Sequence, residues 1–220
     1  MKNSLANKYI KEKIRIALNE DFGASGDITS KTLISKRSTL KASIHVKESA
    51  ILCGTKFAYQ TFKMLDNSIK IKMLKEDGSK VIKGDKIITV SGSAESILSA
   101  ERTALNFLGL MSGIASKTRK YVDIAKTYGV KIYSTRKTIP GIREMQKYAL
   151  TVGGAYVNRS SLSDFYFIKD NHLSDEDNLI DKIKKIRRSK LKKKITVEVD
   201  TIKQLQEILD QKIDIVLLDN

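Results

Sequence analysis

The pattern of hydrophobic and polar positions changes part-way along the chain. Up to about Met111, apolar residues recur at helical spacing over 10–18 and 55–65, and they alternate as in strands over 42–52, 69–78 and 80–92. Turn-forming residues fill 21–30, and the pairs Asp77-Gly78 and Gly84-Asp85 interrupt the later strands. The first half of the chain is therefore predicted to be a mixed α/β domain.

A long helical pattern follows, from residue 94 to about residue 128, with a break predicted near Ser112 and Gly113. Beyond it, short apolar runs at 130–135, 155–157, 165–168, 195–199 and 215–218 alternate with helical stretches. That alternation is typical of βα units and a parallel sheet. We therefore predict two domains, 1–111 and 112–220, in an α/β fold.

Charged residues stand at or near the ends of these apolar runs. In a parallel α/β barrel the functional residues lie at the carboxyl ends of the strands, where the loops open into one site. Each of five successive apolar runs has a charged residue at or near that end. This pattern predicts that the charged residues share one functional site at the open end of the barrel. The charged residues concerned are Arg136, Lys137, Arg159, Lys169, Glu198 and Asp219.

This combination of charges favours chemistry on a phosphorylated sugar. Arginine binds carboxylates and phosphates through a planar fork and lysine acts as a point charge, so the basic members are candidate anion ligands. Glu198 and Asp219 suit sugar hydroxyls, Mg²⁺ or the positive charge that develops at an anomeric carbon. The chain has no suitable GxSxG, GxxxxGK[ST] or GxGxxG motif, which argues against a Ser-His-Asp hydrolase, a P-loop and a Rossmann site.

Composition indicates a globular protein. The 220 residues are 41% hydrophobic and 30% charged, which suits a chain with a substantial core. No run approaches the roughly 20 apolar residues of a membrane span, and residues 1–23 are too charged for a signal peptide. We therefore predict a cytoplasmic location without a membrane partner. The one cysteine, Cys53, lies in an apolar run and is predicted to be a buried structural thiol.

The formal net charge is +16, from 41 Lys and Arg against 25 Asp and Glu. Such a charge is compatible with nucleic acid, an anionic surface or acidic small substrates. One basic segment, 182–194, lies in a helical pattern and has no aromatic ring for stacking, which favours a solvated helix face over a nucleic-acid patch. We therefore predict no nucleic-acid partner. His45 lies in an alternating strand and is predicted to face solvent.

Six motifs, in order over nearly the whole chain, resemble the quinolinate phosphoribosyltransferase family, also called nicotinate-nucleotide pyrophosphorylase (carboxylating). The pair TRKTIPG and IKDNH is the most specific part of the resemblance. The motifs are GDITS (26–30), AERTALNFLGLMSGIAS (100–116), STRKTIPGIREMQKYAL (134–150), IKDNH (168–172), VEVD (197–200) and LLDN (217–220).

The resemblance implies an N-terminal α/β sandwich domain followed by an open, incomplete parallel α/β barrel of the type II phosphoribosyltransferase kind. It implies that quinolinate and phosphoribosyl pyrophosphate react, with Mg²⁺, to give nicotinate mononucleotide, pyrophosphate and CO₂ in NAD synthesis. It also implies a homodimer in which Arg102 crosses to the partner's site. Taken without the resemblance, the favoured interpretation of Arg102 is a helix-surface arginine paired with Glu101 or another nearby acid.

The resemblance also assigns roles to individual residues. It implies that Thr135, Arg136 and Lys137 contact the quinolinate carboxylates, with Arg159 and Lys169 as further basic ligands. Glu198 and Asp219 match the acids near the ribose and the metal. The residues implied to be catalytic are Lys137, Glu198 and Asp219.

The chain departs from the family pattern at two places. Asn158 stands where histidine is expected, and asparagine can donate a hydrogen bond but cannot become cationic. Family members continue beyond the position of Asn220 with further βα units, whose glycine-rich loops hold the phosphoribosyl phosphate. The 220 residues alone are therefore expected to have weak or no activity.

The sequence leaves two other interpretations of the protein open. One is the paralogous pyrophosphorylase-like family of molybdenum transport loci, which shares the fold and some motifs, although TRKTIPG and IKDNH favour the quinolinate type. The other is a non-catalytic remnant that dimerises or binds an anion without turnover.

Overall fold

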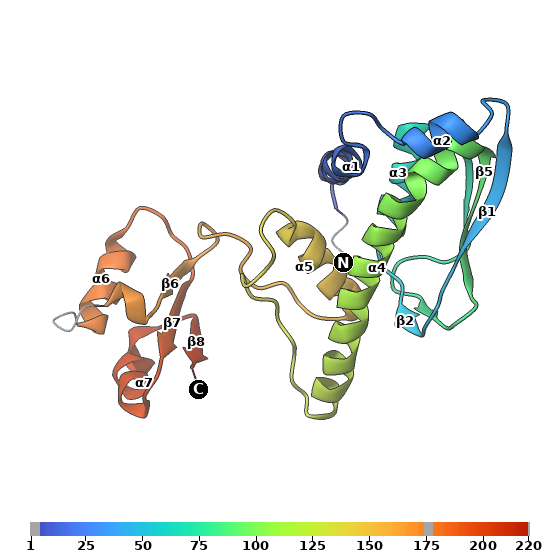
Figure 1. Cartoon of the computed structure of the whole chain (residues 1–220). Coiled ribbons are helices and arrows are strands. Elements are labelled where there is room, and N and C mark those ends of the chain that lie inside the picture. Colours follow the sequence, from blue (N-terminus) through green and yellow to red (C-terminus); the bar gives the residue numbers. More distant parts are fainter. Residues whose placement is uncertain (1–4, 174–177, 220) are drawn as a thin grey trace. The chain divides into compact units, whose positions relative to one another are not determined.

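The computed structural model describes residues 5–173 and 178–219, and these residues form two compact units, Met1–Asn158 and Arg159–Asn220. Figure 1 traces both units along the chain. Helices and strands are mixed in each, so the predicted α/β class is confirmed. The predicted domain boundary, between residues 111 and 112, falls within a continuous helix of the first unit and stays a prediction.

The first unit is built on a three-stranded antiparallel sheet with strand order β1-β5-β3. A second, two-stranded antiparallel sheet joins β2 to β4. The elements are α1 (Asn7–Phe22), α2 (Ile28–Leu33), β1 (Thr39–His45), β2 (Ala50–Ile51), α3 (Thr55–Leu65), β3 (Lys70–Met73), β4 (Lys80–Val81), β5 (Lys86–Ser93), α4 (Ala94–Thr127) and α5 (Arg143–Gly153).

Helices α3 and α4 cover one face of the three-stranded sheet (Figure 1). Their apolar residues, among them Phe62 and Ala104, share a buried cluster with Ile88 and Val90 of β5. Alternation along β5 sends these two side chains inward and leaves the intervening polar residues on the opposite face of the sheet. The N-terminal sheet domain therefore has one packed face and one exposed face.

Helix α4 is continuous, so the break predicted near Ser112 and Gly113 is wrong. The Ser112 hydroxyl donates to the carbonyl of Cys53 at 3.1 Å and accepts from its amide at 2.9 Å. A serine that would weaken an isolated helix is thus used to attach α4 to the loop before α3. The expected strand over 42–52 is also interrupted, because it forms β1 and β2 with a turn between them.

Helix α5 packs very closely against α4. A Cβ built on Gly153 would lie 2.6 Å from the carbonyl oxygen of Ala115 and 2.6 Å from Cβ of Thr118. The two helices share a second buried cluster with α1 and α3, in which Met111 and Met145 are almost fully buried. The predicted strands at 130–135 and 155–157 reduce to a single parallel bridge, between Tyr133 and Tyr156.

The second unit is a three-stranded parallel sheet with strand order β6-β7-β8. Helices α6 and α7 connect successive strands and pack on one face, where Ile183 and Ile208 meet Val197 in a buried cluster. The elements are β6 (Tyr166–Ile168), the 3-10 turn η1 (Asp170–His172), α6 (Leu179–Arg188), β7 (Ile195–Val199), α7 (Ile202–Ile208), η2 (Leu209–Gln211) and β8 (Ile215–Leu218).

Candidate active site

Three strand ends of the parallel sheet carry the predicted site residues of the second unit. Lys169 directly follows β6, Glu198 is the fourth residue of β7, and Asp219 directly follows β8. Ile168, Val197 and Val199 pack into the helix-covered core, so alternation places Lys169, Glu198 and Asp219 on the other face. The sheet thereby collects one base and two acids at its carboxyl edge.

Lys169 and Glu198 form an ion pair across neighbouring strands. The Glu198 side chain is only 9% exposed and that of Lys169 is 37% exposed, so the carboxylate lies in the wall of the site and the ammonium at its surface. A largely buried carboxylate would be costly without a charged partner. Because an ammonium has three N–H groups, Lys169 can hold Glu198 and still donate to a ligand.

An aromatic ring, Phe167, links Arg159 to this pair. The Arg159 guanidinium lies 5.5 Å from the centre of the ring and the Lys169 ammonium 4.8 Å from it. Arg159 is fixed by hydrogen bonds of 3.1 Å to the carbonyls of Ser161, Leu162 and Phe165. Arg159 and Phe167 also line a cavity of about 650 Å³ in this unit. Sequence reasoning missed Phe167, although its position two residues before Lys169 in a strand was a usable signal.

The remaining residues of the IKDNH motif (168–172) fix the backbone conformation at Lys169. The Nδ1 atom of His172 accepts a hydrogen bond of 3.0 Å from the Lys169 amide, and the His172 amide donates to the Lys169 carbonyl at 2.9 Å. This closed 3-10 turn holds the chain directly after β6 in one conformation. His172 was quoted within the motif without a role, and its place here is that of a positioning residue.

Asp219 is exposed, and its backbone amide donates to the carbonyl of Val199 at 3.1 Å. Among the described residues its carboxylate has no hydrogen-bond or ion-pair partner. Thr196, two residues before Glu198, is 4% exposed and its hydroxyl also lacks a partner within the described chain. The face therefore has one acid, Asp219, that is available to a ligand, whereas the Thr196 hydroxyl is buried.

The predicted basic residues of the first unit lie in the loop before α5. The Lys137 amide donates to the Thr135 hydroxyl at 3.1 Å, and both side chains are exposed. Arg136 is half-buried, and its Nε is buried without a partner among the described residues. Thr138 ties the loop to α5, because its hydroxyl accepts from Nε of Arg143 at 2.9 Å. The loop thus presents one exposed and one partly enclosed cation.

Arg102 is exposed on α4, and no ion pair to Glu101 or to any other described acid occurs. Its neighbour Thr103 is buried and donates to the Asp21 carboxylate of α1, which fixes the rotation of the helix around this position. Asn158 is exposed, and its amide donates to the Ser134 hydroxyl at 3.3 Å.

Three smaller predictions are confirmed. Cys53 is fully buried, and that burial raises the pKa of its thiol well above the usual range. His45 is exposed, with its ring nitrogens bonded to the Ser43 hydroxyl at 2.9 Å and the Gly84 carbonyl at 3.3 Å. In the basic segment 182–194, the part on α6 has Ile183 buried in the core and most of its charged side chains exposed, as expected of a solvated helix face, while residues 189–194 lie beyond the end of the helix.

Neither a candidate membrane span nor a metal-binding cluster occurs in the described part of the chain. None of its helices is long and apolar enough to cross a membrane. No group of three or more His, Cys, Asp or Glu side chains there could hold a metal ion.

Comparison with known proteins identifies both parts of the sequence. Residues 27–112 match the family model for the N-terminal domain of quinolinate phosphoribosyl transferase, and residues 114–220 match the model for its C-terminal domain. A probable nicotinate-nucleotide pyrophosphorylase (carboxylating) of Methanocaldococcus jannaschii is 38% identical over 218 residues, covering 96% of this chain and 74% of the relative. The corresponding protein of Bacillus subtilis is 36% identical, covering 91% and 69%.

Solved structures show the same fold. The nicotinate-nucleotide pyrophosphorylase of Francisella tularensis superposes with a TM-score of 0.93 at 37% identity, covering all of this chain and 78% of the other. NadC from Streptococcus pyogenes gives a TM-score of 0.94 at 33% identity, covering 99% and 77%. The chain spans 58% of the length of a mitochondrial quinolinate phosphoribosyltransferase (decarboxylating) of Nicotiana tabacum, to which it is 38% identical.

Proposed function

The chain belongs to the quinolinate phosphoribosyltransferase family, and on that premise we propose that it transfers a phosphoribosyl group to quinolinate with loss of CO₂. The products are nicotinate mononucleotide, pyrophosphate and CO₂, in the synthesis of NAD. The observation that carries the proposal is the carboxyl edge of the parallel sheet, where Lys169, Glu198 and Asp219 share one face with Arg159 nearby.

Binding of quinolinate is assigned to the cations. Lys169 is fixed on its backbone side by His172 and keeps donors to spare, so it can bind a carboxylate without leaving Glu198. Within the first unit, Arg136 and Lys137 are neighbours in the loop before α5, and we assign them to the quinolinate carboxylates because the TRKTIPG motif implies that role. Fixing both carboxylates orients the ring nitrogen towards the anomeric carbon of the sugar.

Transfer then requires an anionic surface for the ribose. As the ring nitrogen bonds to the anomeric carbon, the bond from that carbon to pyrophosphate breaks and the ribose carries positive charge. Glu198 and Asp219 are the carboxylates assigned to stabilise that charge, and Glu198 is largely buried, where electrostatic interactions are strong. As CO₂ leaves, the electron pair of the breaking carbon–carboxylate bond stays on the ring carbon, where the adjacent cationic nitrogen stabilises it, and a proton from solvent then bonds to that carbon.

The donor set fits Mg²⁺ that arrives with phosphoribosyl pyrophosphate. Mg²⁺ is usually held by one or two carboxylates together with substrate phosphates, and here Asp219 is exposed with a carboxylate that meets no other described group. Asp219, with Glu198 beside it in the sheet, would hold the ion. When bound, Mg²⁺ supplies charge neutralisation for the departing pyrophosphate.

A homodimer in which Arg102 contributes to the partner's site is part of the proposal. Arg102 is exposed and lies one helical turn from Leu98, which is 39% exposed, and two turns from Leu110, which is 41% exposed. A helix face with exposed leucines on either side of an arginine is suited to an interface between subunits. The cytoplasmic location expected from the sequence stays a prediction.

A substrate panel tests the proposed specificity. Quinolinate, nicotinate and a pyrimidine carboxylate are each offered with phosphoribosyl pyrophosphate and Mg²⁺, and nucleotide products are separated by chromatography. The proposal expects product from quinolinate alone. Preference for another acid would favour the paralogous family, and binding of quinolinate without product would indicate a remnant.

A further inference from the structure

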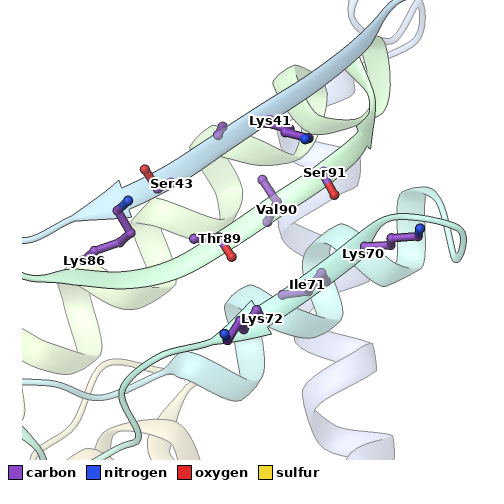
Figure 2. Close-up of a pocket in the computed structure, with 10 residues that line it drawn as sticks. Lys41, Ser43, Lys70, Ile71, Lys72, Lys86, Thr89, Val90 and Ser91 are labelled. Carbon is purple, nitrogen blue, oxygen red and sulfur yellow. The ribbon is translucent and has the colours of Figure 1, made fainter.

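The exposed face of the N-terminal sheet carries a hollow of about 410 Å³ that the proposed reaction does not use (Figure 2). Four lysines line it and come from all three strands: Lys41 from β1, Lys70 and Lys72 from β3, and Lys86 from β5. The hollow lies within the first unit, on the opposite face of the sheet from α3 and α4.

The strand register arranges the lining in two parallel rows. In the first row, Ser91 of the central strand β5 is paired with Lys41 on one side and Lys70 on the other. In the second row, Thr89 is paired with Ser43 and Lys72. The rows are about 7 Å apart, because each residue of a strand advances the chain by about 3.4 Å. Each row therefore places a hydroxyl at the centre and at least one lysine beside it.

The charges of this face have no counter-charges. No acidic residue lines the hollow, and none of the four lysines has an ion pair with any described residue. Lys70 and Lys72 are two residues, or about 7 Å of strand, apart, and two unit charges at that separation in water repel by about 0.6 kcal/mol before salt screening, so the face is stable without a ligand. A ligand with several adjacent negative charges gains from all four lysines together.

From this geometry we propose that the hollow is a second anion site, which binds a chain of two or more consecutive phosphates, as in inorganic triphosphate or a nucleoside triphosphate. Lysine ammonium groups and hydroxyls both donate to phosphate oxygens, and a spacing of about 7 Å between the rows suits the two ends of a short chain of phosphates rather than a single phosphate. The volume is in the range of small-ligand sites.

A nucleic acid fits the same charges less well. No aromatic ring lines the hollow, so the bases of a single strand have nothing on which to stack. A duplex is bound along an extended track of phosphate contacts, whereas these four lysines line a single hollow of about 410 Å³.

The test is a calorimetric titration of the full chain with inorganic triphosphate at low salt and without Mg²⁺. The variant Lys70→Gln/Lys72→Gln removes two charges from β3 and keeps most of each side chain. The matched control, Lys120→Gln/Lys126→Gln, removes the same charge from exposed positions of α4. The proposal expects saturable binding to the wild type, roughly tenfold weaker binding to the β3 variant, and a change of no more than about twofold in the control.

Two further measurements test which anion the hollow prefers and guard against a variant that does not fold. Orthophosphate is expected to bind more weakly than triphosphate, and the single variant Lys41→Gln tests the opposite strand should the β3 variant not fold. Absence of saturable binding, equal losses in the β3 variant and the control, or unchanged binding in the β3 variant would each overturn the proposal. So would a short DNA or RNA duplex that binds these lysines more tightly than triphosphate does.

Discussion

The Lys169 ammonium and the Glu198 carboxylate form an ion pair between neighbouring parallel strands. The strand register brings them together, because Ile168 pairs with Val197 and the next residue of each strand is Lys169 and Glu198 respectively. Since the Glu198 side chain is only 9% exposed, the carboxylate depends on this partner. The ion pair therefore connects Lys169, which is proposed to bind a quinolinate carboxylate, to Glu198, which is proposed to stabilise positive charge on the ribose.

The pair is predicted to act as a unit in turnover. Lys169→Gln and Glu198→Gln should each lower kcat/KM for quinolinate by about a hundredfold or more, because each removes one charge from the reacting face and leaves the other without its partner. The double variant should lose much less than the product of the two single losses. Steady-state kinetics on the four proteins measure this coupling, and independent, multiplicative losses would show that the residues act separately.

Gly153 is predicted to be indispensable for the packing of α5 on α4. Gly153→Ala should lower the free energy of unfolding by about 1–3 kcal/mol, because the new Cβ would meet the Ala115 carbonyl oxygen at 2.6 Å. Gly109→Ala is the matched control, since no atom lies within 4 Å of its Cβ position, and it should be neutral or stabilise by up to about 1 kcal/mol. Urea unfolding of both variants gives the comparison, and a Gly153→Ala protein as stable as Gly109→Ala would refute the packing argument.

Asp77 is predicted to be a major stabilising residue of the first unit. Its carboxylate accepts from the amides of Gly54 and Thr55 at 3.1 and 2.9 Å and from the Tyr148 hydroxyl at 2.8 Å, so it caps α3 and attaches α5. Asp77→Ala should lower the free energy of unfolding by about 3 kcal/mol, and Glu76→Ala, its exposed neighbour, by less than about 0.5 kcal/mol. Similar values for the two variants in urea unfolding would contradict this role.

The contribution of Asp27 to stability is predicted to depend on pH. Hydrogen bonds from Ser30, then from the Ser99 hydroxyl, hold the pKa of Asp27 below its usual value. A lowered folded pKa gives stability that is complete above the unfolded pKa of about 3.9 and is lost as the pH falls through the folded pKa. The difference in unfolding free energy between wild type and Asp27→Ala, about 1 kcal/mol at neutral pH, should therefore shrink below about pH 4. A constant difference from pH 7 to pH 3 would exclude the effect.

The regular elements could be predicted from sequence because their patterns are local. α3, β7 and β8 coincide with the predicted ranges 55–65, 195–199 and 215–218. α3 and β7 bury apolar residues at the spacing of their own secondary structure, and β8 is a short continuous apolar run, so the local pattern identifies each of them. The charged residues at the ends of β7 and β8 were located for the same reason.

Other features could not be predicted because they depend on residues far apart in the chain. The six-residue helix α2 begins within the segment predicted to be turns, 21–30, and its cap, Asp27, is held by Ser99 of α4. Asp77 caps a helix that begins more than twenty residues earlier, and Phe167 gains its role only when Arg159 folds over it. Periodicity carries no information on such contacts.

The central claim is tested most directly by measuring nicotinate mononucleotide and CO₂ formed from carboxyl-labelled quinolinate, phosphoribosyl pyrophosphate and Mg²⁺, with wild type and Lys137→Ala side by side. The account predicts that the low turnover expected of these 220 residues gives equal amounts of the two products, with a rate at least about a hundredfold lower in Lys137→Ala and an unchanged unfolding transition, because Lys137 is exposed. Unequal amounts of the two products, or turnover of Lys137→Ala close to the wild-type rate, would contradict it.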